Sequence, residues 1–159
     1  MGNVRLENNV LEVVGMLEEE AVAFLYEAGG ELLSQVQRNT RVNEGQLKGS
    51  WKLVVDENNL TATVGSPLEN AIWEEFGTGE FAVNGDGRKG GWWLKVGSGA
   101  NEIAPNVAER YKWKQVRRDK DGNLTFVFTE GKKPNRALTN AFTKTKPKIQ
   151  RRLQQIIGG

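Results

Sequence analysis

The apolar residues near the N-terminus recur with the period of an α-helix, and this pattern restricts the fold more than any other in the chain. From residue 10 onward they lie three or four positions apart: Val10, Val14, Leu17, Ala21, Phe24, Ala28, Leu32 and Val36. On a helix these residues form one stripe that must be buried against another element. We therefore predict a helix from Val10 to Asn39-Thr40. A kink or break is expected at Gly29-Gly30, because each glycine costs about 1 kcal/mol relative to alanine.

Two pairs of segments, each separated by a turn sequence, alternate apolar with polar residues: 47–55 with 60–65, and 111–117 with 124–129. Alternation with a period of two is typical of strands that have one buried face and one wet face. The turn between the first pair is Asp56-Glu57-Asn58-Asn59, and the turn between the second is Asp119 to Asn123. We expect two antiparallel hairpins.

A second helical stripe lies near the C-terminus: Ala137, Leu138, Ala141 and Phe142, then Ile149, Leu153, Ile156 and Ile157. Pro147 separates its two halves and predicts a kink or restart, because proline costs about 3 kcal/mol inside a helix. Together with the first helix and the hairpins, this stripe predicts an α+β fold: two long helices packed on one face of a mainly antiparallel, about four-stranded sheet. A length of 159 residues suits a single domain over residues 1–159.

Residues 77–99 contain eight glycines. We expect residues 80–100 to form a flexible glycine-rich excursion, because long loops of this kind are functional or disordered. Trp92 and Trp93 lie within it, and each indole has roughly 150–250 Å² to bury. They should therefore fold back onto the core or anchor on a partner. Gly85-x-Gly87-x-x-Gly90 imitates a dinucleotide fingerprint, but no βαβ pattern surrounds it.

The composition removes most enzyme chemistry, because the chain has no cysteine and no histidine. Disulfides, thiolates, histidine bases and the usual zinc ligands are therefore absent. Glu74, Glu75 and Asp86 remain as candidate catalytic or metal-binding carboxylates, but adjacent glutamates on a helix point about 100° apart. We predict no enzymatic activity and no catalytic, cofactor or metal site. No apolar run approaches the roughly 18 residues that a membrane span requires.

Charge is distributed unevenly. Residues 1–31 hold seven glutamates and one basic residue, whereas residues 132–152 hold eight basic residues and no acid. Two solvated helix faces, contacts between neighbouring copies, or a basic face toward nucleic acid are all consistent with this pattern. Tyr111 to Arg118 also interleaves aromatic with basic residues, as single-strand-binding surfaces do, although a wet hairpin has the same pattern. The alternative function is therefore a nucleic-acid-binding module that uses the basic C-terminal helix and the Tyr111–Arg118 strand.

The stretch Ala71 to Gly79, with the sequence AIWEEFGTG, places two glutamates between large aromatic residues and ends in a glycine corner. A helical turn would put Ile72 and Phe76 on one face and turn Glu74 or Glu75 away from it. We expect Phe76 to be buried and Gly77 to cap the turn. Glu75 should either accept local backbone N–H groups or pair with a basic residue on a neighbouring copy.

Glu75-Phe76-Gly77-Thr78-Gly79, with Ala71 four residues before the glutamate, resembles a corner of the siphophage tail-component family, the head-tail joining or tail-completion proteins. Gly45, Leu47 and Ser50 match an upstream run of that family, whose Pro, Asp and Thr are replaced here by Arg41, Asn43 and Glu44. Pro134, Leu138, Ala141 and Phe142 resemble the start of its last helix. The resemblance extends over roughly residues 10–157 and is weakest over 80–115.

The resemblance implies a structural virion protein, made in the host bacterial cytoplasm, that joins or completes the phage tail at the head-tail junction, the neck. It implies a ring of copies with six-fold symmetry, which the acidic and basic helices could join by complementary charge. The implied partners are further copies, connector or adaptor proteins, and tail terminator or tail-tube proteins, with incidental contact to passing DNA and no membrane. The candidate protein-interaction residues are Glu75, Phe76, Gly77, Thr78, Gly79, Trp92, Trp93, Arg151 and Arg152.

Overall fold

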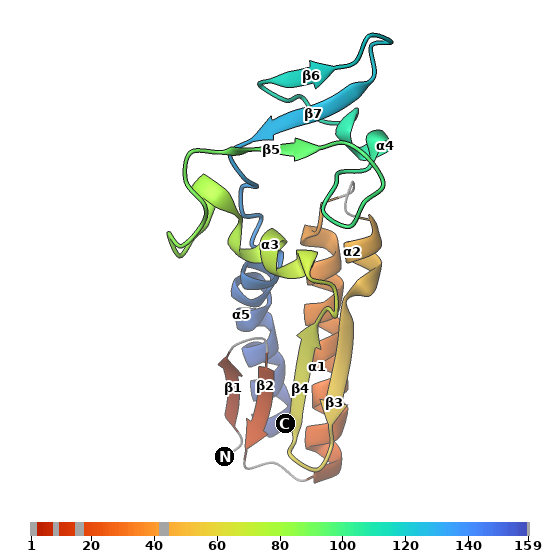
Figure 1. Ribbon diagram of the computed structural model, residues 1–159. Helices are drawn as coiled ribbons and strands as arrows, with labels where there is room; N and C mark the ends of the chain where they lie inside the picture. Colours follow the sequence, from red (N-terminus) through yellow and green to blue (C-terminus); the bar gives the residue numbers. More distant parts are fainter. Residues whose placement is uncertain (1–2, 8–9, 15–17, 42–44, 159) are drawn as a thin grey trace. The chain divides into compact units, whose positions relative to one another are not determined.

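The computed structural model describes residues 3–7, 10–14, 18–41 and 45–158 (Figure 1). The chain divides into two compact units. Unit 1 consists of residues 1–75 and 135–159, and unit 2 consists of residues 76–134, so unit 2 is inserted into the sequence of unit 1. That both units fold together as the single domain expected over residues 1–159 stays a prediction.

Unit 1 has the predicted α+β class, with helices packed on an antiparallel sheet. Its strands pair in the order β1-β2-β4-β3, and Figure 1 shows α1 and α5 behind them. The bounds are β1 (Asn3–Glu7), β2 (Val10–Val14), α1 (Glu18–Asn39), α2 (Gly45–Ser50), β3 (Lys52–Asp56), β4 (Thr61–Gly65), α3 (Asn70–Phe76) and α5 (Ala137–Gly158). The hairpin predicted for residues 47–65 is β3–β4, in which Val54 lies opposite Thr63.

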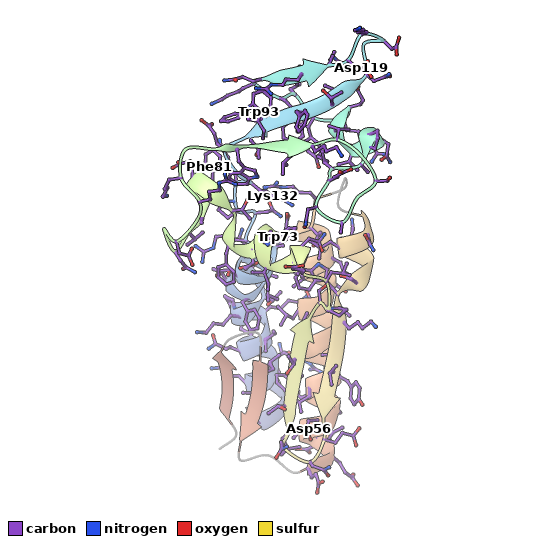
Figure 2. The ribbon with its side chains drawn as sticks, viewed as in Figure 1. Asp56, Trp73, Phe81, Trp93, Asp119 and Lys132 are labelled. Atoms are coloured by element: carbon purple, nitrogen blue, oxygen red, sulfur yellow. The ribbon has the colours of Figure 1, made fainter. Side chains whose placement is uncertain are left out.

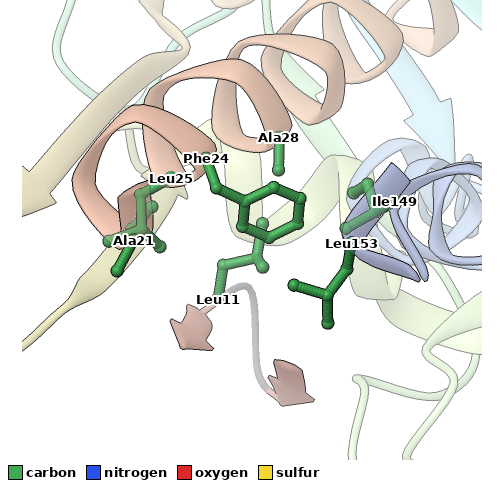
Figure 3. Close-up of a cluster of buried hydrophobic side chains, with 8 residues drawn as sticks. Leu11, Ala21, Phe24, Leu25, Ala28, Ile149 and Leu153 are labelled. Atoms are coloured by element: carbon green, nitrogen blue, oxygen red, sulfur yellow. The ribbon is translucent and has the colours of Figure 1, made fainter. Parts of the chain in front are cut away.

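The core of unit 1 lies between the two long helices and the sheet. The stripe of α1 meets Leu11 of β2 and the apolar residues Ile149 and Leu153 of α5, as Figure 3 shows. Ala62 of β4 belongs to the same cluster. The first buried cluster is Leu11, Ala21, Phe24, Leu25, Ala28, Ala62, Ile149 and Leu153; the second is Leu32, Val36, Leu47, Trp51, Val64, Ala71 and Ala141. Full burial of each large apolar side chain contributes about 1.5–3 kcal/mol. The two helical stripes therefore account for most of the driving force of this unit.

The prediction that the first helix starts at Val10 is wrong. Val10–Val14 forms β2, which pairs with both β1 and β4, and α1 begins at Glu18; residues 15–17 lie outside the described ranges. A step of four, as between Val10 and Val14, is even, so it places both residues on one face of a strand as well as of a helix. Valine favours the strand because its branched side chain suits a pleated surface.

The predicted break at Gly29-Gly30 and restart at Pro147 are wrong, because α1 and α5 each continue through these residues as one helix. A kink at either place stays a prediction. Gly29 has a packing role, since a Cβ added there would lie 2.6 Å from Leu53 Cδ1 of β3. A Cβ at Gly30 would meet nothing within 4 Å. A short helix, α2, also occupies Gly45–Ser50, where the first strand was expected to start, and it buries Leu47.

Unit 2 is built on a separate three-stranded antiparallel sheet in the order β5-β7-β6. Its elements are η2 (Gly79–Phe81), β5 (Trp92–Lys95), α4 (Pro105–Ala108), β6 (Val116–Arg118) and β7 (Leu124–Thr129). The second predicted hairpin is present as β6–β7, but its first strand covers only Val116–Arg118, and residues 111–115, which were also expected in that strand, are not in a strand. The expectation that this hairpin shares a sheet with the first is wrong. Trp92 and Trp93 supply the third strand, which sequence alternation did not reveal. Flexibility of residues 80–100 stays a prediction.

The core of unit 2 lies on one face of this sheet. It consists of Ala108, Leu124 and Val127, with Leu94, Val96, Ile103 and Trp113 packed around them. The Trp113 indole donates a hydrogen bond of 2.7 Å to the Ala108 carbonyl. In the β6–β7 turn, the Asp119 carboxylate accepts the N–H groups of Asn123 and Asp121. These hydrogen bonds lower the pKa of the Asp119 carboxyl below its ordinary value, and the bond from the Asn123 backbone N–H has the largest effect.

We predict opposite effects of alanine at the two neighbouring glycines of α1. Gly30→Ala should raise the free energy of unfolding by about 0.5–1 kcal/mol, because alanine is the better helix former and its methyl group meets open space. The free energy of unfolding of Gly29→Ala should be at least about 1 kcal/mol lower than that of Gly30→Ala, because Leu53 must move away from the new methyl group. Urea unfolding of both variants measures this, and equal stabilisation by the two would contradict the packing of α1 against β3.

Candidate functional site at helix α3

Helix α3 has the opposite amphipathicity to the one expected from sequence. It buries Ala71, Glu74 and Glu75, and it exposes Ile72 and Trp73, whose exposed fractions are 60% and 45%. Trp73 is labelled in Figure 2. Phe76, the last residue of the helix, is 42% exposed, so the prediction that it is buried is wrong. The inversion places two carboxylates in unit 1 and leaves large apolar side chains on the outside.

The Glu75 carboxylate lies at the N-terminus of α5. Its Oε2 accepts the N–H of Leu138 and its Oε1 accepts the N–H of Thr139, each at 2.9 Å, and the Thr139 hydroxyl donates to Oε1 as well. The first N–H groups of a helix lack partners within the helix, and the helix dipole favours negative charge at this end. The prediction that Glu75 binds local backbone N–H groups in the glycine corner is wrong, because the N–H groups that it binds belong to the distant helix α5. Pairing of Glu75 with a neighbouring copy stays a prediction.

Glu74 reinforces the same junction through its backbone. Its carbonyl accepts the N–H groups of Asn135 and Arg136, at 2.8 and 3.2 Å. Its carboxylate is fully buried, and Oε1 lies 3.8 Å from Nε of Arg41. The two glutamates therefore face different partners, a cation and a helix terminus, and do not form a carboxylate pair. Asp86 is exposed, and the described residues contain no cluster of three or more acidic side chains that could hold a metal ion.

Amide side chains connect the end of α1 to the start of α5. Asn135 Nδ2 donates to the Asn39 carbonyl at 2.8 Å, and Asn39 Nδ2 donates to the Ala137 carbonyl at 3.1 Å. Gln35 Nε2 holds Asn39 in place by donating to its Oδ1 at 2.8 Å. The ends of three helices, α1, α3 and α5, thus share one hydrogen-bonded network within unit 1.

In the glycine corner, the backbone of residues 77–79 passes close to the backbone of residues 130–132 within unit 2. Gly77 and Gly79 have φ of 70° and 61°, values that favour glycine. The Thr78 N–H donates to the Lys132 carbonyl at 2.9 Å, and the Lys132 N–H donates back to Thr78 Oγ1 at 2.8 Å. A Cβ at Gly79 would collide with the Glu130 carbonyl oxygen. These contacts give Gly77, Thr78 and Gly79 a structural part in closing this loop.

The remaining candidate residues lie in two places. Trp92 and Trp93 belong to β5, where the Arg88 guanidinium is 5.2 Å from the Trp92 ring centroid. Arg151 is exposed on α5, whereas Arg152 Nε lies 2.7 Å from Glu27 Oε1 of α1. Lys148 and Glu31 pair similarly at 2.9 Å, beside a pocket of about 130 Å³. The acidic and basic helices therefore pair within one chain, at least at these two bridges.

Two exposed features of the structure were not predicted from the sequence. One is the exposed pair Ile72 and Trp73, which was expected inside because large apolar residues are usually buried. The other is the position of Arg117 over the Trp93 ring in the sheet of unit 2. An available signal for the first was Glu74-Glu75 itself, since burying both carboxylates forces the neighbouring apolar residues outward.

Residues 5–77 match the HK97-gp10-like family, described as "Bacteriophage HK97-gp10, putative tail-component". The matched segment runs from within β1 to Gly77 and includes all of α3. It confirms, over those residues, the resemblance inferred from the sequence. No curated protein matches the chain, and no solved structure matches it. Among the described residues, no helix is both long and apolar enough to span a membrane.

We predict that Glu75→Gln lowers the free energy of unfolding by about 1–2 kcal/mol. The amide keeps one acceptor oxygen but loses the charge and turns N–H donors toward the N–H groups of α5. Asp86→Asn, at an exposed position outside any helix or strand, also removes one negative charge and should stay within about 0.5 kcal/mol of the wild type. Thermal unfolding followed by far-UV circular dichroism measures both. Equal melting temperatures would contradict the capping role.

Proposed function

We propose that this chain, which through residues 5–77 belongs to the HK97-gp10-like family of phage tail components, is a structural, non-enzymatic virion protein that joins or completes the tail at the head-tail junction. The family match supports a structural tail protein. The observation that carries the joining role is the outer face of α3, which we define as Ile72 and Trp73. It exposes two large apolar side chains inside the matched segment.

The outer face of α3 has the composition of a protein-protein contact. Tryptophan is enriched among the residues that contribute most to binding energy at interfaces. Ile72 and Trp73 lie side by side in the sequence, and both are exposed, so they do not belong to the core and are available for a contact. Phe76, at the end of the same helix, adds a further exposed aromatic ring. We infer that this face packs against a neighbouring copy.

A ring of copies is the arrangement that we propose, with six-fold symmetry and with connector or adaptor proteins on one side and tail terminator or tail-tube proteins on the other. A ring needs two different surfaces that fit each other. Charges left over from the pairing of α1 with α5 support such a fit. Glu18, Glu19 and Glu20 are exposed in the first turn of α1, and Arg151 is exposed on α5. Arg152 is a weaker candidate for a contact with a neighbouring copy, because it already pairs with Glu27.

The basic C-terminal helix is a weaker candidate for binding nucleic acid than its charge suggests. Lys148 and Arg152 face carboxylates of α1, which reduce the potential that these cations present to phosphate. A protein contact at α3 needs no such potential. Joining therefore fits unit 1 better than nucleic-acid binding does.

We predict that replacing the outer face of α3 abolishes assembly without unfolding the chain. Ile72→Ser with Trp73→Ser removes two exposed apolar side chains, so stability should change by less than about 1 kcal/mol. Copies should fail to associate, and infected cells should accumulate separate heads and tails. Sedimentation of the purified chain and electron-microscopic counts of particles measure these effects.

The matched control is Ile157→Ser, which removes another exposed isoleucine near the end of α5. It should leave both assembly and the number of joined particles at wild-type levels. Normal joining by the double variant at α3 would refute the proposed role of this face. Equal loss in the control would show that exposed apolar residues in general, and not α3, control association.

A further inference from the structure

The sheet of unit 2 has one face that its own core does not use. Trp93 lies opposite Phe128, Lys95 lies opposite Phe126, and Arg117 lies opposite Phe126 on the other edge of β7. Residues that lie directly opposite each other in antiparallel strands have side chains on the same face. We call this surface, Trp93, Lys95, Arg117, Phe126 and Phe128, the aromatic face; Figure 2 labels Trp93 within it.

The aromatic face and the core of unit 2 are on the two different faces of the same sheet. The buried residue Val127 and its neighbour Leu94 point to the other side, where Ala108, Ile103 and Trp113 cover them. None of Trp93, Phe126 and Phe128 joins a buried apolar cluster of the described residues, and each is only half-buried. Three aromatic rings on one side of a three-stranded sheet are thus partly open to solvent.

Arg117 lies over one of these rings, that of Trp93. The Arg117 guanidinium carbon lies 4.4 Å from the Trp93 ring centroid, and Trp93 meets Phe128 edge to face at 5.5 Å. The guanidinium has five N–H donors, and stacking on a ring leaves their edges available. Within residues 76–134, all of which the structure describes, Arg117 forms no ion pair with a carboxylate.

The charge of unit 2 favours an anionic partner. Residues 76–134 hold eleven Lys and Arg residues and seven Asp and Glu residues. Four of those acids already face cations of the same unit, in the pairs Glu80–Lys89, Glu102–Lys95, Glu109–Arg118 and Glu130–Lys114. The Asp119 carboxylate is occupied by its own turn. The excess positive charge is therefore not neutralised within the unit.

We propose that the aromatic face binds single-stranded nucleic acid. Bases would stack on Phe126, Phe128 and the Trp93 edge, and Arg117 would bind a phosphate. Open aromatic rings beside a cation without an ion-pair partner, here Arg117, suit sequence-tolerant single-strand binding, because every base has a flat π-face and every nucleotide has a charge. A duplex keeps its bases stacked inside and could use only the cations. An apolar protein segment would use the rings and leave Arg117 without a role.

The test uses the purified full-length chain and a fluorescein-labelled oligothymidylate of about 20 nucleotides, with fluorescence anisotropy as the readout. The proposal predicts binding at low salt that weakens steeply as salt rises, quenching of tryptophan fluorescence, and at least about tenfold weaker binding to a duplex of equal length. Arg117→Gln and Phe126→Leu should each weaken single-strand binding about tenfold. Arg117 is exposed, so its variant should fold normally.

The control is Arg110→Gln, which removes the charge of another exposed arginine of unit 2 that follows α4, on the core side of the sheet. It should weaken binding less than about twofold. Three results would overturn the proposal: no binding at low salt, equal affinity for single strand and duplex, or equal loss in the Arg110 and Arg117 variants. The last two results would show that nucleic acid binds only through a general attraction between opposite charges. None of these results bears on assembly through α3.

Discussion

Unit 1 depends on a carboxylate that lies 63 residues before the backbone N–H group it binds, the contact from Leu138 to Glu75. This contact supplies partners for the first turn of α5 and fixes that helix at the end of α3. The Glu74 carbonyl and the Asn39–Asn135 amides hold the same junction from two other sides. A helix that carries much of the apolar core is thereby placed by polar groups. Its burial against α1 then supplies the larger part of the free energy.

The cost of this arrangement falls on α3, and the proposed function makes use of it. A short helix that turns Glu74 and Glu75 inward has no buried position left for Ile72 and Trp73, so they face outward. Substitutions can therefore separate stability from assembly, because the two properties depend on opposite faces of one helix. In unit 2 a similar division exists between the core side of the sheet and the aromatic face.

The elements with a long, regular apolar period were predictable from the sequence, and those set by distant partners were not. The stripe from Ala21 to Val36 and the alternation in β3 and β4 correctly identified α1, the first hairpin and the α+β class. Val10–Val14 was misassigned because a step of four fits both periods. Phe76 was misplaced because the partner of Glu75 is a helix terminus that local spacing cannot reveal. Trp92–Lys95 shows no alternation, so its pairing with β7 was also hidden.

Contact between the outer face of α3 and a second copy is tested most directly by site-specific cross-linking in assembled particles. A photoreactive phenylalanine in place of Trp73 projects from the exposed side of the helix, where a neighbouring copy should lie within reach. Irradiation of intact virions, followed by mass spectrometry, identifies the bonded peptide. We expect a covalent dimer of this chain that is absent from dissociated protein at the same concentration. Bonds found only within one chain, or only to a different virion protein, would contradict the proposed ring contact.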